Sequence, residues 1–93
     1  MVIKPDLERS VNSGTQKMYR FENGYGASVV RHSFSYGRES GLWELAVITF
    51  EGDDILQFNL CYSSPITNGV IGNLSESEVE DYLLKIKDLP SHD

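Results

Sequence analysis

The stretch KMYRFENGYGASVVRHSF, residues 17–34, decides the fold. Apolar and polar side chains alternate on both sides of Asn23-Gly24, as they do in strands with one buried face. Asn and Gly both tolerate positive φ, which the type I′ turn of a two-residue hairpin loop requires. We therefore predict an antiparallel hairpin of strands 17–22 and 25–34, with Asn23 and Gly24 in the turn.

Two further strands are predicted after this hairpin. Residues 42–50 are apolar at both alternating sets of positions, which is typical of a central strand covered on both faces. The acidic stretch 51–54 predicts a tight turn. Residues 55–62 then carry one apolar stripe opposite polar side chains, as in a half-buried strand. Residues 63–74 are predicted to be irregular, because Pro65 has no N–H group to donate to a sheet.

The C-terminal part of the sequence predicts one amphipathic helix. Ser75 is a good N-cap, and Glu78 three positions later completes a capping box. Pro90 marks the end of the helix. Apolar side chains recur at helical spacing and form a single stripe: Val79, Tyr82, Leu83, Ile86 and Leu89. We expect this stripe to cover one face of the sheet.

These elements together predict one α+β domain, an antiparallel β-meander of about four strands packed by one C-terminal amphipathic helix. A chain of 93 residues suits a single core. We assign the domain to residues 17–90. Residues 1–16 are predicted to be a flexible N-terminal tail, because Pro5 and several small polar residues interrupt any hydrophobic period. Residues 91–93 are predicted to be a short C-terminal tail.

The charge balance argues against nucleic acid as a partner. The net charge is −6, and residues 51–93 carry nine acidic and only two basic side chains. Affinity for nucleic acid comes largely from Lys and Arg, so this half suits a basic protein surface better.

The single cysteine, Cys61, cannot form an intrachain disulfide, which fits the reducing cytoplasm. No apolar run approaches the roughly 18 residues of a membrane span, so no membrane partner is expected.

No group of side chains in the sequence predicts catalysis, and we expect a protein that is not an enzyme. His32 lies in a predicted strand, where a packing role is the commoner one. The acidic turn around Asp53 and Asp54 lacks the ligand pattern of a calcium loop. No Cys/His set fits zinc, so neither a metal nor a cofactor is expected. Three aromatic residues either form a patch for a partner or belong to the core: Tyr25, Tyr36 and Trp43.

Several segments of the chain resemble a family of small proteins encoded by phages and prophages. They span roughly residues 19–89 and include NGYGASVVRH (23–32), SYG (35–37), GLWELAV (41–47), PIT (65–67) and VIG (70–72). The two longest strings make the resemblance fairly specific. It implies a phage-encoded accessory protein in the cytoplasm of a bacterial host. It assigns no role to any residue.

The leading hypothesis for function is binding to a host or phage protein. One version of it is inhibition of a host defence or nucleic-acid-handling factor, whose basic groove an acidic surface would occupy. The candidate binding residues are acidic side chains of the helix and of the turn: Glu76, Glu80 and Asp81, with Glu51, Asp53 and Asp54. The alternative is a structural or assembly protein that self-associates through its sheet, for example as a homodimer, with no host target.

Overall fold

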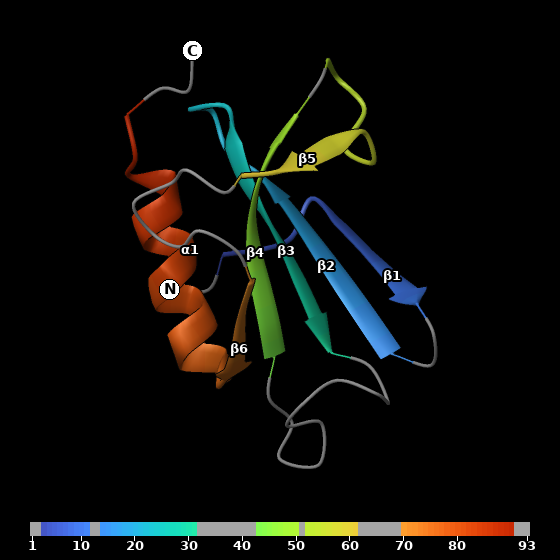
Figure 1. The fold of residues 1–93 in the computed structure, drawn as a ribbon, viewed down its shortest axis with the longest axis vertical. Coiled ribbons are helices and arrows are strands. Elements are labelled where there is room, and N and C mark those ends of the chain that lie inside the picture. Colours follow the sequence, from blue (N-terminus) through green and yellow to red (C-terminus); the bar gives the residue numbers. More distant parts are fainter. Residues whose placement is uncertain (1–2, 12–13, 32–42, 51, 62–69, 91–93) are drawn as a thin grey trace.

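One antiparallel sheet and one helix make up the described part of the protein (Figure 1). The computed structural model describes residues 3–11, 14–31, 43–50, 52–61 and 70–90. In chain order the elements are β1 (Leu7–Val11), β2 (Gly14–Arg20), β3 (Tyr25–Arg31), β4 (Trp43–Phe50), β5 (Phe58–Leu60), β6 (Val70–Leu74) and α1 (Glu76–Lys87). The sheet order is β1-β2-β3-β4-β5, and β6 also pairs with β4. The predicted α+β class is confirmed, with more strands than the four expected.

The first strand lies in the segment predicted to be a tail. Residues 7–11 pair with β2 from Leu7↔Met18 to Val11↔Gly14. β2 itself begins at Gly14, so the prediction of a tail over residues 1–16 is wrong for most of that segment. The strand was not predicted because the side chains at its centre are polar and give no alternating pattern. Its main chain is held by pairing with β2. The tail predicted at 91–93 lies outside the described residues.

The prediction that residues 63–74 are irregular is wrong for β6, residues 70–74, and residues 63–69 lie outside the described part of the chain. β6 pairs with the first half of β4, and the three-residue β5 pairs with its second half. The register between β6 and β4 shifts opposite Glu44, where Gly72 and Asn73 together face one residue. Asn73 has a positive φ of 60°, a conformation that Asn tolerates better than most residues. This β-bulge turns the chain so that Leu74 enters the core just before α1 begins.

The turn between β2 and β3 differs from the predicted two-residue loop. Phe21 pairs with Tyr25 through its N–H group (2.9 Å), and Gly24 N–H donates to the Phe21 carbonyl (3.2 Å). Three residues therefore form the loop. Only Gly24 has a positive φ, 88°, whereas a type I′ turn would need it at Asn23 as well. The arrangement is a type I turn followed by a glycine bulge, the usual form of a three-residue hairpin loop.

Asn23 joins this turn to the end of the helix. Its Nδ2 lies 2.8, 3.2 and 3.0 Å from the carbonyl oxygens of Ile86, Lys87 and Leu89. Its Oδ1 accepts a hydrogen bond from Tyr25 N–H (3.0 Å). The last carbonyls of a helix have no partner in the regular helical pattern, so the Asn23 amide supplies donors to them, and the Ile86 carbonyl also accepts from Leu89 N–H (3.2 Å).

The helix forms as its sequence predicts. Ser75 Oγ accepts from Glu78 N–H (3.2 Å), and Glu78 Oε1 accepts from Ser75 N–H (3.0 Å), which completes the capping box. The hydrogen bond from Ser75 N–H to the Glu78 carboxylate, and then the Ser75 side chain, lower the pKa of the Glu78 carboxyl. The predicted apolar stripe packs on the sheet and forms one core with residues of β2, β3 and β4 and with Cys61 and Leu74; its members are Val79, Tyr82, Leu83, Ile86 and Leu89.

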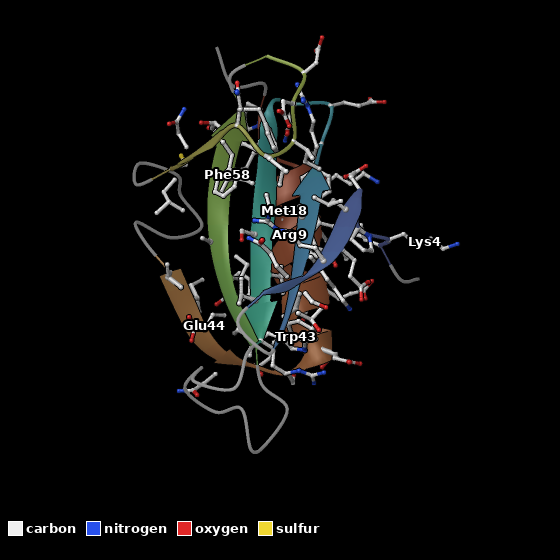
Figure 2. The ribbon with its side chains drawn as sticks, turned by 90° about the vertical axis from the view of Figure 1, so that its right-hand side faces the viewer. Lys4, Arg9, Met18, Trp43, Glu44 and Phe58 are labelled. Atoms are coloured by element: carbon white, nitrogen blue, oxygen red, sulfur yellow. The ribbon has the colours of Figure 1, made fainter. Side chains whose placement is uncertain are left out.

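The face of the sheet turned away from α1 is also partly buried. Figure 2 shows this face, with Arg9, Met18 and Phe58 on it and β1 and β5 crossing in front of the central strands. Met18 and Ile48 are fully buried here, so β4 is covered on both sides, as its sequence predicts. Gly26 permits the packing: a Cβ at this position would overlap the Tyr19 carbonyl oxygen and lie 2.7 Å from the Phe50 ring.

Replacing Asn23 tests its role in joining hairpin and helix. Asn23→Ala removes the donors to the helix end, and we expect it to lower the free energy of unfolding by about 1–2 kcal/mol. Asn23→Asp should cost more, because it also places a negative charge at the negative end of the helix dipole. Urea denaturation measures both. Asn59→Asp, in the exposed part of β5, is the matched control; equal losses in N23D and N59D would contradict this role.

Candidate functional site

A cavity of about 190 Å³ lies between α1 and the sheet, on the side closed by residues 3–5. Its position follows from the two elements that form its walls. Lys17 and Tyr19 stand two residues apart on β2, so both lie on the face that α1 covers. Val29 is the β3 partner of Lys17. The apolar part of the wall consists of Ile3, Pro5, Val29, Val79 and Leu83.

The N-terminal segment is fixed over this cavity by main-chain hydrogen bonds. Ile3 N–H donates to Glu80 Oε1 (3.0 Å), a contact between residues at opposite ends of the chain. Asp6 N–H donates to the Met18 carbonyl (2.8 Å), and Asp6 Oδ2 accepts from Arg20 N–H (2.7 Å). Asp6 is thus held on β2, and the segment before it crosses from there to α1, which brings Ile3 to the helix (Figure 1).

Two cationic side chains contact Trp43, which lines the cavity. The Lys17 ammonium lies 4.8 Å from the centroid of the Trp43 ring, and the Arg31 guanidinium lies 4.5 Å from it. Such contacts between a cation and an aromatic ring are favourable. The Trp43 side chain is only 3 % exposed, and its Nε1–H is a buried donor without an acceptor among the described residues. An unpaired buried donor costs about 1–3 kcal/mol.

The part of the cavity near Tyr19 is acidic. Burial and three carboxylates, with Glu80 first among them, raise the pKa of the Tyr19 hydroxyl to about 12. The other two are Glu8 and Asp6. Glu76 and Glu80 also line the cavity, four residues apart on α1. The cavity thus places a basic group of side chains and an acidic group around one apolar space.

The described acidic residues that were predicted as a binding site lie in different parts of the molecule. Glu76 and Glu80 line the cavity, and Asp81 is exposed on α1. Asp53 and Asp54 are exposed in the connection between β4 and β5, at the end of the molecule where α1 finishes (Figure 1). Glu51 lies outside the described residues.

The contact of Lys17 and Arg31 with Trp43 was not predicted from the sequence. Trp43 was one of three residues considered for an aromatic patch; it is buried, Tyr25 packs against the same core, and Tyr36 lies outside the described residues. His32 also lies outside them. The alternation of Lys17 and Tyr19 on one strand was visible in the sequence. No pattern in the sequence predicted that residues 3–5 would line the cavity.

The comparisons with known proteins add no relative. No family model matches the chain, and neither the curated proteins nor the solved structures contain a match. The resemblance to small phage and prophage proteins therefore stays a prediction.

Among the described residues, no three His, Cys, Asp or Glu side chains are grouped so that they could hold a metal ion. The one described helix is too short and too polar to cross a membrane.

The Tyr19 hydroxyl gives a pH-dependent test of the site. Its folded-state pKa of about 12 exceeds the ordinary value of 10.0, so folding favours the neutral form. The stabilisation it provides is complete below pH 10 and is lost as the pH rises towards 12, by roughly 2–3 kcal/mol in all. Denaturation of wild type and Tyr19→Phe from neutral to alkaline pH measures it. The difference between the two proteins should change only above pH 10; a constant difference throughout would contradict this assignment.

Proposed function

We propose that this protein is a non-catalytic accessory protein of a phage or prophage that acts in the bacterial cytoplasm by binding another protein. The observation that carries the proposal is the exposed face of α1. Leu84 is 43 % exposed there, one helical turn from the exposed Asp81. An exposed apolar side chain beside acidic ones is a composition that suits a protein interface.

The acidic charge of α1 and of the whole chain selects the kind of partner. Four of the acidic residues of α1 and its C-cap are exposed, and the chain as a whole carries a net charge of −6; they are Glu76, Glu78, Asp81 and Asp88. Electrostatic complementarity favours a basic protein surface and opposes nucleic acid. A host factor that handles nucleic acid has such a basic surface. Binding to that surface would inhibit the host factor, so the charge supports an inhibitory role.

Reversing the charge and removing the apolar group together tests this surface. The tagged protein is used to capture partners from nuclease-treated lysate of a bacterial host, and a retained protein is purified for direct affinity measurement. Asp81→Lys with Leu84→Ser should weaken binding at least about tenfold, because it replaces attraction by repulsion and removes apolar contact. Glu22→Lys changes the same charge in the exposed β2–β3 turn and should bind like wild type. Unchanged affinity of the double variant would refute the proposed surface.

A second candidate function is self-association through the sheet. Leu60 and Val70 are 42 % and 57 % exposed. They are the cross-strand partners of Ile48 and Ala46, so both lie on the face turned away from α1. The free edge of β1 is a poorer candidate, because its exposed Glu8 and Arg9 oppose the addition of another strand.

Sedimentation velocity over a range of protein concentrations tests the second candidate. A concentration-dependent dimer that Leu60→Ser with Val70→Ser returns to monomer would support assembly through this face. The matched control is Leu84→Ser, which removes an equally exposed leucine from α1 and should leave the dimer intact. A monomer at every concentration would rule out self-association and leave binding to a different protein.

A further inference from the structure

The turn between β2 and β3 contains a chemically reactive pair, Asn23-Gly24. In a flexible chain the backbone nitrogen of such a glycine attacks the side-chain amide of the asparagine, because glycine has no Cβ to obstruct the approach. A bond forms between the Gly24 nitrogen and Asn23 Cγ while the bond from Cγ to Nδ2 breaks. Solvent takes the proton of the Gly24 N–H, and Nδ2 leaves as ammonia. Water then opens the resulting cyclic imide and leaves aspartate or isoaspartate.

The folded turn holds each polar group that takes part in this reaction. Asn23 Nδ2, the leaving group, lies within 3.2 Å of three carbonyl oxygens at the end of α1. Asn23 Oδ1 accepts a hydrogen bond from Tyr25 N–H. Gly24 N–H, which supplies the attacking nitrogen, donates to the Phe21 carbonyl. Since the Gly24 nitrogen must lose its proton and Nδ2 must leave the helix end, the turn has to open before the reaction can finish.

The product of the reaction does not fit the place that Asn23 occupies. Aspartate and isoaspartate carry an oxygen where Nδ2 stood, and an ionised carboxylate has no hydrogen to donate to the helix carbonyls. The new negative charge also faces the negative end of the helix dipole. Isoaspartate in addition inserts a carbon atom into the main chain of a hydrogen-bonded turn. Conversion therefore prevents the turn from returning to the end of α1.

We propose that Asn23-Gly24 is a modification site that the fold keeps closed, and that water converts Asn23 to aspartate or isoaspartate after the turn has left the end of α1. Segments of a folded protein open locally at a lower free energy than the whole domain unfolds. Because ammonia is lost to the solvent, the conversion is a one-way switch. The site is independent of the proposed protein partner, since it does not involve the exposed Asp81 and Leu84.

Peptide mass spectrometry of the full chain, incubated at mildly alkaline pH, tests the proposal. Conversion changes the mass of the peptide that contains residue 23, and the isoaspartate form elutes as a separate peak. We expect conversion in buffer to be at least about tenfold slower than in guanidinium chloride, because only open molecules react. In the denatured chain Asn68-Gly69, the second Asn-Gly pair of the sequence, should convert about as fast as Asn23 and is the internal reference.

Two isoleucines provide matched variants that leave the reactive pair unchanged. Ile86 is fully buried near the end of α1, and Ile48 is fully buried on the opposite face of the sheet. Ile86→Val weakens the packing of the helix end and should raise the rate of conversion in buffer several-fold. Ile48→Val removes the same methylene group from β4 and should raise the rate less. Both variants should convert like wild type in guanidinium chloride.

Gly24→Ala tests the chemistry without depending on whether the variant folds. In guanidinium chloride it should slow conversion of Asn23 at least about tenfold, since the added Cβ obstructs the attack on Cγ, while Asn68 converts as before. The converted wild-type protein carries one more negative charge and can be purified by anion exchange. It should unfold at a lower concentration of denaturant than the unconverted protein.

Four results would overturn the proposal. The first is conversion of Asn23 at the same rate in buffer and in guanidinium chloride. The second is equal acceleration by Ile86→Val and Ile48→Val, which would make global unfolding the step that exposes the amide. The third is a Gly24→Ala chain that converts as fast as wild type when denatured. The fourth is a converted protein as stable as the unconverted one.

Discussion

The contact of the Asn23 side chain with the end of α1 is the constraint on which the rest of the structure depends. One amide approaches three carbonyl oxygens of the helix end and also accepts a hydrogen bond from Tyr25 N–H in its own turn. The far end of the helix is fixed by the capping box at Ser75 and by the bulge at Asn73. Because both ends are held, the helix has one position along the sheet. That position places Glu76 and Glu80 on the cavity.

The sheet contributes a second constraint, which is that both of its faces are packed although only one helix is present. The face turned away from α1 buries Met18 and Ile48, and Phe50 lies close over Gly26. Arg20 covers the Phe50 ring at 4.7 Å and donates to the Gly52 carbonyl. A small chain gains buried apolar area in this way without a second helix.

The sequence predicted the elements whose formation is governed by local pattern and missed those held by other strands. The helix was predictable because its caps and its apolar stripe lie within one segment, and β4 because both of its faces are apolar. β1 was missed because residues 7–11 have a polar centre, and β6 because a bulge interrupts its pairing. The hairpin was predicted, yet its turn type was wrong, since Asn23 bonds to the helix end and φ becomes positive only at Gly24.

The cavity was beyond local reasoning for the same physical reason. Part of its wall is the N-terminal segment, whose Ile3 N–H donates to Glu80 Oε1, far away in the sequence. The signal available in the sequence was the identity of the side chains on β2, where Lys17 and Tyr19 stand two residues apart. Their meeting with Trp43 and with the helix carboxylates depends on strand register and on the path of residues 3–5, which no local pattern encodes.

The acidic residues of α1 can be separated by what each does within the fold. Glu78 completes the capping box, and Glu80 holds the N-terminal segment. Glu76 lies in the first turn, where the helix dipole favours a negative charge, and lines the cavity. Asp81 and the exposed Leu84 have no such role among the described residues. Since folding does not account for this pair, its exposure is the better guide to a partner, whereas Glu76 and Glu80 line the cavity and Glu78 caps the helix.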